Sequence, residues 1–575
     1  MRSWLTLEAG FYQRQVRHRI YGTIPSSRNQ LKCSTAVRFR ERMATSHLNH
    51  ESSMMRLKIL LIYPEVPQTF WSLTHALRFM GKRAYSPPLG LLTVAAMLPP
   101  EFQQRLRDLN LEPLRDDDLA WADYVFLSAM SIQQDSARRV IDRCKQAGVK
   151  IVAGGPLFTS EPGEFSDVDH LVLNEAEVTL PGFLADLAKG EAKPVYSSAE
   201  FADVCNSPLP AYQLLEAKYY GALSVQFSRG CPYQCDFCDV TTLFGRRPRI
   251  KTAAQTIAEL DNIYHVGWRG KIYFVDDNLM ANRPYLKDEL LPAVIRWKRD
   301  KRGISFHTQI TMNLADDQEL MDLMYEAGFD WIFIGIETPD EGSLAECNKK
   351  QNLHRNLPEQ IRRLQRSGLQ VQGGFIVGFD HDPPDIFRRQ FELIQENGIV
   401  MAMVGLLQAP VGTELFKRLK REGRLLGAFS GNNVLDDTNI VTRMDRDTLR
   451  SNYRALVKAL YEPKNYYNRV RNLLVQLKEP KEKPPLTKEV LLAVLRCFFW
   501  LGLIRKGREH FWRVFLWACF HKRESLQNFL GLAILGYHFC KIHEDLLGRP
   551  QAGPTRGGFA EKQTQLPEPA TLLVE

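Results

Sequence analysis

Three cysteines fall within eight residues of the chain, and they are the side chains whose type and spacing most clearly imply chemistry. Cys231, Cys235 and Cys238 lie in the stretch SVQFSRGCPYQCDFCDV, directly after a run typical of a strand. Zinc sites usually complete four ligands with a second cysteine pair or with histidines. No second pair exists here, and no histidine lies closer than His265. Structural zinc and a packing coincidence remain the alternatives.

A 4Fe–4S cluster explains the presence of three cysteines better than a zinc ion does. Such a cluster normally takes four thiolates, one for each iron. Three thiolates leave one iron open, and an open iron suits a catalyst because a substrate can coordinate it. The spacing therefore favours an iron–sulfur cluster that takes part in a reaction.

The length and composition are those of a globular protein with several domains. The chain has 575 residues, of which 44% are apolar and 25% charged, and this length predicts about two to four domains. No run of eighteen uncharged apolar residues occurs, so we expect no membrane-spanning helix. The other cysteines are scattered and no signal peptide is evident, which favours a reducing cytoplasm.

The net charge of +9 is unevenly distributed. Residues 1–55 hold nine Lys or Arg and only three acidic residues, so most of the excess lies there. We therefore predict no nucleic-acid partner for the rest of the chain. A basic tail could bind anions or target the chain, but we favour a disordered extension. Met54 and Met55 would make a natural start of translation.

Residues 56–195 alternate between apolar strands and helices. This alternation predicts an open, doubly wound α/β sheet. The segment 196–222 has several prolines and no clear period, which indicates a linker. The predicted strands are Leu57–Tyr63, Tyr124–Met130, Val149–Gly155 and His170–Glu177.

A second alternation of six strand–helix units covers residues 223–420 and predicts a partial (β/α)6 barrel. Chemistry in such barrels sits at the carboxyl ends of the strands, and the three cysteines follow the first strand at that end. Thr252 with Gln255 is a capping-box signature for the first helix. The predicted strands are 223–228, 271–277, 304–310, 331–337, 369–379 and 400–409. We predict a further region at 421–478, a helical tail at 479–549 and disorder at 550–575.

The cysteine motif is similar to the signature of radical S-adenosylmethionine (SAM) enzymes, C-x-x-x-C-x-x-C after the first strand with an aromatic, Phe237, before the last cysteine. The resemblance implies that Cys231, Cys235 and Cys238 ligate three irons of a 4Fe–4S cluster. It further implies that the fourth iron chelates SAM, and that one electron then yields a 5′-deoxyadenosyl radical. That radical abstracts hydrogen from an unactivated carbon.

The same resemblance implies a SAM site at the ends of the later strands. VDDN stands where the family often carries Gly-Gly-Glu, and a carboxylate there could accept from the methionine ammonium. The third and fourth strand ends offer ribose or carboxylate contacts, and GGFIVGFD resembles a glycine motif near the adenine. An ordinary loop-capping role is the alternative for each residue. The implied residues are Phe237, Asp276, Asp277, Asn278, Gln309, Asn313, Glu337 and Gly378.

The N-terminal sheet resembles the cobalamin-binding domain of the same superfamily. The usual Asp-x-His-x-x-Gly is absent, and His75 lacks its spacing, so we read His75 as a helix or packing residue. If cobalamin binds, we expect no histidine to replace its lower base. A sheet that has lost its ligand is the alternative. The residues that the resemblance assigns to cobalamin are Ser128, Gly154, Gly155 and Glu175.

From about Leu57 to Leu474 the whole arrangement resembles the cobalamin-binding radical SAM proteins that include hopanoid C-2 methylases. This implies methyl transfer to an unactivated carbon of a small or lipid-like substrate, with a reductant such as flavodoxin or ferredoxin. The alternatives are cobalamin-assisted oxidation, cyclisation or rearrangement, and, from another class, a non-catalytic iron–sulfur sensor or scaffold.

The tail segment VLLAVLRCFFWLGLI has basic flanks and could lie on a membrane surface. An amphipathic helix packed on the barrel is the alternative, and Arg496 within the run argues against a spanning helix. We therefore expect a cytoplasmic protein with possible peripheral contact at the inner face of the membrane.

Overall fold

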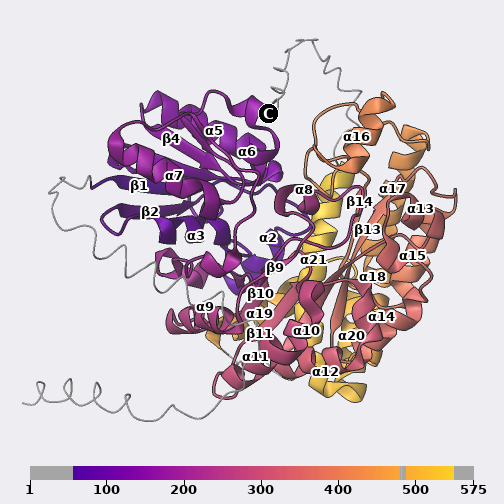
Figure 1. Cartoon of the computed structure of the whole chain (residues 1–575). Helices are drawn as coiled ribbons and strands as arrows, with labels where there is room; N and C mark the ends of the chain where they lie inside the picture. Colours follow the sequence, from indigo (N-terminus) through magenta and orange to yellow (C-terminus); the bar gives the residue numbers. More distant parts are fainter. Residues whose placement is uncertain (1–55, 480, 482–486, 549–575) are drawn as a thin grey trace, which may run out of the picture. The chain divides into compact units, whose positions relative to one another are not determined.

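Two parallel sheets of six strands each carry the architecture of this computed structural model (Figure 1). The structure describes residues 56–479, 481 and 487–548. The predicted basic extension, the proposed translation start and the predicted disordered end therefore lie outside the described residues.

The first sheet has the strand order β2-β1-β3-β4-β5-β6. Leu60 and Ile62 of β1 pack into one hydrophobic core, and Ile59 and Leu61 pack into another. Because successive side chains of a strand point to opposite faces, both faces of this sheet are covered, which confirms the doubly wound prediction. The strands are β1 (Lys58–Tyr63), β2 (Gln103–Asp108), β3 (Tyr124–Ser128), β4 (Lys150–Gly154), β5 (His170–Val172) and β6 (Val195–Tyr196).

Two strands of this sheet were not predicted, namely β2 and β6. β2 has the sequence QQRLRD and is half exposed along its length, so it lacks the apolar run of a buried strand. β6 has only two residues and lies at the edge of the sheet. The predicted domain limits at 195, 222, 420 and 478 stay predictions.

The second sheet follows the order β7-β10-β11-β12-β13-β14, and every neighbouring pair is parallel. The six predicted strand–helix units are thus confirmed. Thr252 accepts a hydrogen bond from the Gln255 N–H at the start of the first helix, as its capping box predicts. The strands are β7 (Ala222–Val225), β10 (Lys271–Phe274), β11 (Ser305–Gln309), β12 (Phe329–Glu337), β13 (Gln370–Val377) and β14 (Ala402–Leu406).

Helices connect and cover the strands of both sheets (Figure 1), and a small antiparallel pair follows β7. That pair is β8 (Ser228–Arg229) and β9 (Arg249–Ile250). The helices of the first sheet are α3 (Leu89–Met97), α4 (Asp116–Trp121), α5 (Gln134–Gln146), α6 (Pro156–Ser160) and α7 (Ala176–Lys189). The short helix α2 (Thr74–Leu77) instead packs against α21 in the core of the barrel. Those of the barrel are α8 (Val240–Phe244), α9 (Ala253–His265), α10 (Arg283–Tyr285), α11 (Leu291–Lys298), α12 (Gln318–Ala327), α13 (Glu341–Glu346), α14 (Leu357–Arg366), α15 (Ile386–Glu396) and α16 (Glu414–Arg421).

The predicted helical C-terminal region covers the free edge of β14. Tyr461 donates its hydroxyl to the Ala402 carbonyl at 2.6 Å, and Tyr453 donates to the Val404 carbonyl at 3.2 Å. These bonds satisfy strand carbonyls that have no neighbouring strand. The region comprises α17 (Arg446–Tyr461), α18 (Pro463–Gln476), α19 (Lys488–Cys497), the π-helical segment η11 (Phe498–Ile504), α20 (Arg508–His521) and α21 (Leu526–Gly548).

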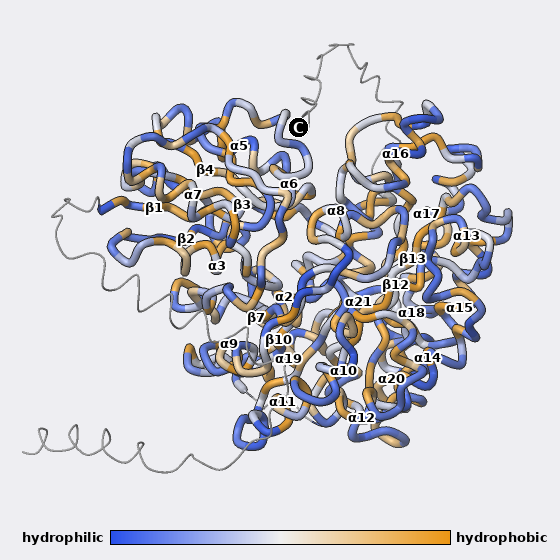
Figure 2. Tube along the Cα trace, viewed as in Figure 1, coloured by the Kyte–Doolittle hydropathy of each residue, from blue (hydrophilic) through white to orange (hydrophobic). Residues whose placement is uncertain are grey.

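Hydropathy follows the same division of interior and surface. Figure 2 shows hydrophobic stretches along interior elements such as α21, whereas the outer loops are largely hydrophilic. Within residues 56–479, 481 and 487–548, no helix combines the length and apolar character needed to cross a membrane.

Candidate cofactor site

The three cysteines lie on a loop that a glycine turn and outside contacts hold in shape. Gly230 has a φ of 93°, and a Cβ there would stand 3.0 Å from the carbonyl oxygens of Phe244 and Gly245. Only glycine fits such a close approach at positive φ. The Cys231 N–H then donates to the Gly245 carbonyl at 3.3 Å, so the first thiol is positioned by its own backbone.

The middle of this loop is anchored by segments far away in the sequence. The Asp236 N–H donates to the Cys347 carbonyl at 3.0 Å, and the Leu415 N–H donates to the Asp236 carbonyl at 2.8 Å. The Asn348 amide donates to the Gln234 carbonyl at 2.8 Å. Because the anchors come from the residues after α13 and from α16, the barrel itself fixes the loop.

The thiols are partly buried, unpaired in disulfides and close to a cation. Burial raises the pKa of the Cys231 and Cys238 thiols, and the Lys349 ammonium acts in the opposite direction. The Gln351 amide lies 3.5 Å from the Cys235 sulfur. A positive charge and an amide donor beside thiolates stabilise their anionic form, so this donor set suits a thiolate-ligated cluster.

Lys349 is in turn held by Glu337, one of the predicted SAM residues. The Lys349 ammonium lies 2.6 Å from a Glu337 carboxylate oxygen, and both side chains are buried. Glu337 has a φ of 66°, which is strained for a residue other than glycine. A Cβ at Gly335 would lie 2.3 Å from that same oxygen. The structure therefore places Glu337 beside the cysteine loop, with its charge already paired.

The two predicted aspartates join the end of β10 to the cysteine loop. Asp276 is fully buried and accepts the Ser228 hydroxyl at 2.6 Å, and burial raises its pKa to about 7. Asp277 accepts the Gly230 N–H at 2.9 Å, and burial raises its pKa to about 6. Asn278 caps the following turn by accepting the Met280 N–H at 3.4 Å. These residues therefore support the loop that carries the thiols.

The other predicted SAM residues are spread along the neighbouring strand ends. Asn313 donates to the Tyr233 hydroxyl of the cysteine loop at 2.9 Å, whereas Gln309 donates to Tyr273 at 2.7 Å. Gly378 has a φ of 106°, and its N–H donates to an Asp382 oxygen at 2.7 Å. The ring of Phe237 lies 6.3 Å from that of Phe379, next to Gly378.

The residues predicted to cradle cobalamin gather at the carboxyl edge of the first sheet, where ligands of open α/β sheets bind. A Cβ at Gly154 would lie 2.6 Å from the Val172 carbonyl oxygen. A Cβ at Gly155, whose φ is 93°, would lie 2.8 Å from the Ser128 hydroxyl. Glycine at both positions therefore allows the ends of β3, β4 and β5 to pack closely at the edge where the resemblance places cobalamin.

Glu175, the fourth residue of that set, belongs to a buried charge cluster. Its carboxylate lies 2.6 Å from Arg249 and 3.3 Å from Arg229, and its side chain is only 2% exposed. Arg229 also pairs with Glu177 at 3.0 Å. Burial alone would raise the pKa of Glu177, but Arg229 outweighs it and holds the pKa at about 2. Because Arg229 directly precedes Gly230, this cluster ties the first sheet to the cysteine loop.

Several residues of the site are not indicated by any spacing or motif in the sequence. Lys349 and Gln351 reach the loop through tertiary contacts, whereas Arg229 directly precedes Gly230 and Tyr233 lies inside the motif itself. His75 lies in α2 with its ring 5.6 Å from His538, in agreement with a helix or packing role. No group of three or more His, Cys, Asp or Glu side chains in the described part of the chain could hold a single metal ion.

Known proteins with these features are similar to the chain over most of its length. Residues 225–394 match the Radical SAM superfamily, residues 83–184 a B12 binding domain, and residues 413–552 a domain of unknown function (DUF4070). An uncharacterized methyltransferase of Synechocystis sp. is 36% identical over 90% of this chain and 97% of its own. The hopanoid C-2 methylase of Rhodopseudomonas palustris is 32% identical over 85% of this chain and 94% of its own.

Among solved structures, the cobalamin-dependent SAM radical enzyme OxsB, with aqua-cobalamin bound, has the same fold. Its TM-score is 0.56 at 16% identity, with 88% of this chain and 84% of that chain covered.

The glycine-edged sheet and the barrel with its three-cysteine loop define a cobalamin-binding radical SAM protein. The chain belongs to the family of such enzymes that includes the hopanoid C-2 methylases. A 4Fe–4S cluster, SAM and cobalamin are the cofactors of this fold.

Proposed function

We propose that this enzyme transfers a methyl group to an unactivated carbon of a lipid-like substrate. The observation that carries the proposal is the buried cluster of Glu175, Glu177, Arg229 and Arg249, which joins the two cofactor-binding parts of one chain. A methyl carrier and a radical generator must act on one substrate, so a fixed connection between them is what the reaction needs.

When bound, the cluster supplies the electron that cleaves SAM, and cobalamin carries the methyl group. The chain contributes the geometry. Cys231, Cys235 and Cys238 would hold the cluster, and the Lys349 ammonium would lie near two of its thiolates, Cys235 and Cys238. Gly154 and Gly155 keep the strand ends of the first sheet closely packed at the edge where the corrin would bind.

The carboxylates of Asp276, Asp277 and Glu337 stand around the same loop, and we propose that this group positions SAM. Each already accepts a hydrogen bond or an ion pair from the protein. Their role is therefore to keep the loop and Lys349 in place around the cofactor. Gln309, Asn313, Phe237 and Gly378 complete the proposed SAM surroundings.

A lipid-like substrate is supported by the relatives. The chain aligns with almost the whole of a hopanoid C-2 methylase, and that name points to a polycyclic lipid as the first substrate class to test. A low-potential donor such as flavodoxin or ferredoxin would supply the electron. We propose a cytoplasmic enzyme that works at the inner face of a membrane.

The test is an anaerobic assay of reconstituted enzyme with SAM, a chemical reductant and a hopanoid. We expect 5′-deoxyadenosine, S-adenosylhomocysteine and a product that has gained one methyl group, each dependent on the hopanoid. Formation of 5′-deoxyadenosine without S-adenosylhomocysteine would refute methyl transfer and favour oxidation, cyclisation or rearrangement. If neither product forms with any lipid tested, the result would favour a non-catalytic sensor or scaffold.

A further inference from the structure

The exposed apolar side chains of the described chain are concentrated in one hairpin. Of eighteen exposed large hydrophobic residues, nine lie between residues 491 and 520, in α19, η11 and α20. We call this segment, residues 488–521, the apolar hairpin. The nine residues are Leu491, Leu492, Leu495, Phe499, Trp500, Leu503, Ile504, Leu516 and Phe520.

The spacing of the residues separates an inner face from an outer face. Ala493, Cys497 and Leu501 recur every four residues and are buried. Leu495, Phe499 and Leu503 recur with the same spacing and are 57%, 52% and 62% exposed. Residues four apart lie on one side of a helix, so the hairpin has two separate apolar faces. One apolar face packs on the protein, and a second apolar face meets solvent.

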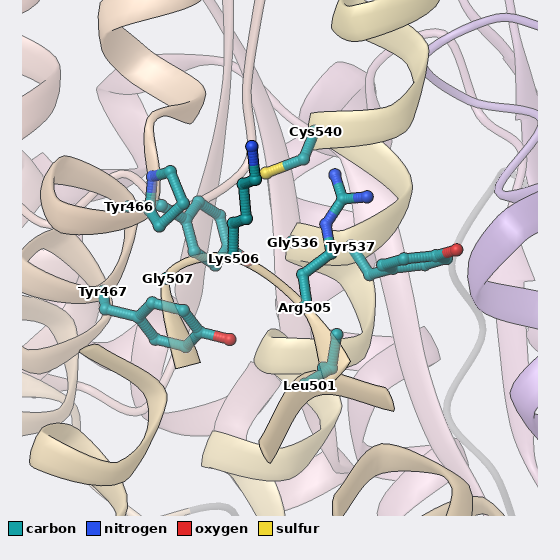
Figure 3. Close-up of a pocket in the computed structure, with 10 residues that line it drawn as sticks. Tyr466, Tyr467, Leu501, Arg505, Lys506, Gly507, Gly536, Tyr537 and Cys540 are labelled. Carbon is teal, nitrogen blue, oxygen red and sulfur yellow. The ribbon is translucent and has the colours of Figure 1, made fainter. Parts of the chain in front are cut away.

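The inner face of the hairpin packs against the body of the protein. A small cavity of about 30 Å³ lies under the turn between η11 and α20. Figure 3 shows the residues of α18, α21 and the turn that line it. A Cβ at Gly507 would lie only 2.4 Å from Pro463. Arg505 pairs with Glu544 and stacks over Tyr537 at 5.2 Å. The turn is therefore fixed against the body of the protein.

The charged residues of the apolar hairpin and its flanks are mostly basic. Residues 488–524 hold eight Lys or Arg and three Glu. Arg508 and Arg513 are exposed, and neither makes an ion pair within the residues that the structure describes. Large apolar and aromatic side chains with unpaired basic neighbours match an anionic lipid surface, where the apolar groups enter the acyl boundary and the cations meet the headgroups.

We propose that the outer face of the apolar hairpin docks on an anionic lipid membrane as a peripheral anchor. The hairpin contains no helix able to span the bilayer, so it lies in the interface. This inference rests on the proposed lipid substrate and adds the surface from which that substrate would be taken.

The hairpin also contacts the segment between β1 and α3, part of which packs on the barrel. Arg496 donates to the Phe79 carbonyl at 2.8 Å, which fixes α19 against the turn Arg78–Met80. Earlier in the same segment, the Trp71 ring meets Phe333 of β12 edge-on, 5.2 Å between centroids. A lipid that leaves the membrane at the hairpin would therefore arrive next to residues that pack on a barrel strand.

The experiment uses the full chain and vesicle flotation. Vesicles of phosphatidylcholine alone are compared with vesicles that also contain phosphatidylglycerol. We expect the wild type to float with the anionic vesicles, and the double variant Leu495→Glu/Phe499→Glu to partition at least about tenfold less. A single change, Leu503→Asn, guards against misfolding and should act in the same direction.

The matched control is Val475→Glu, which places the same charge on a 56% exposed apolar residue of α18. It should float like the wild type. Arg508→Glu/Arg513→Glu should weaken binding to anionic vesicles only, and added salt should remove that difference. Circular dichroism and iron content confirm that each variant is folded.

Flotation of the hairpin variants at the wild-type level would overturn the proposal. So would a wild type that ignores vesicles and dimerises through this face, seen as a dimer by light scattering that Leu495→Glu/Phe499→Glu converts to a monomer. The proposed function fails separately. Vesicle binding without S-adenosylhomocysteine formation would refute methyl transfer alone, and methyl transfer without vesicle binding would refute the anchor alone.

Discussion

The buried pair between Glu177 and Arg229 allows a quantitative prediction for the substitution Glu177→Gln. Glutamine keeps the shape of the side chain and can still accept the Ser207 hydroxyl, which lies 2.7 Å from the carboxylate. Only the negative charge is lost. The Glu177 side chain is 8% exposed and that of Arg229 is 12% exposed, so solvent screens the pair weakly.

Two independent estimates give a similar loss of stability for Glu177→Gln. The pKa of Glu177 falls from 4.5 to about 2, and each unit corresponds to about 1.4 kcal/mol, so the charge stabilises the fold by about 3 kcal/mol. Removing one partner of a buried ion pair typically costs about 3–5 kcal/mol. We therefore expect Glu177→Gln to lower the free energy of unfolding by about 3 kcal/mol, or Tm by about 2–3 °C for a cooperative unit of this chain's length.

The pH dependence of unfolding tests independently whether the Glu177 charge stabilises the fold. The folded-state pKa of Glu177 is depressed, so its stabilisation is fully present above about pH 5 and is lost as the pH falls toward 2. The Tm difference between wild type and Glu177→Gln should therefore be constant near neutral pH and narrow below pH 5. At pH 3.5 the free-energy gap should be about 1 kcal/mol smaller.

The assay is thermal unfolding of the cluster-free protein by circular dichroism, which avoids acid damage to the cluster. Glu392→Gln is the matched control, because its partner Arg388 sits four residues away on an exposed helix face. Such surface pairs contribute about 0.5 kcal/mol or less. A Glu177→Gln shift no larger than that of the control, or a gap that stays constant down to pH 3.5, would refute the reasoning.

Two further substitutions test the cofactor sites. Cys238→Ala should abolish the cluster, so iron and acid-labile sulfide in anaerobically reconstituted protein should fall from about four each per chain to background; full iron content would contradict the ligand assignment. Gly155→Ala places a methyl group 2.8 Å from the Ser128 hydroxyl at positive φ, so corrin content should fall while iron content stays at the wild-type level; unchanged corrin binding would remove these glycines from the cobalamin site.

The sequence predicts those elements whose signal is local. The strand around Leu60 and the six barrel strands are apolar runs, and each is found. β2 was not predicted because it is a polar edge strand, QQRLRD, in which Leu106 is the single apolar residue. Spacing likewise singles out Cys231, Cys235 and Cys238, since a cluster motif is a local property of one loop.

The surroundings of the loop are not a local property. Lys349 is more than a hundred residues from Cys238 in the sequence, and its role depends on the fold that brings Glu337 beside the thiols. Glu175 resembles a cobalamin residue in its sequence context, yet the structure gives it Arg249 as a partner. Pairing of buried charges depends on tertiary contacts, and periodicity or spacing carries no information about them.

The C-terminal region, which matches a domain of unknown function, is part of the barrel architecture. The Phe539 ring of α21 stacks on Phe70 at 4.2 Å, and Phe70 adjoins Trp71, which packs against a barrel strand. With Tyr453 and Tyr461 on the β14 carbonyls, this region supplies both edge cover and core contacts. Deleting residues 480–575 would remove α21 together with the apolar hairpin. Loss of membrane binding in such a truncation would therefore reflect damage to the barrel as much as loss of the anchor, and point substitutions on the outer face separate the two.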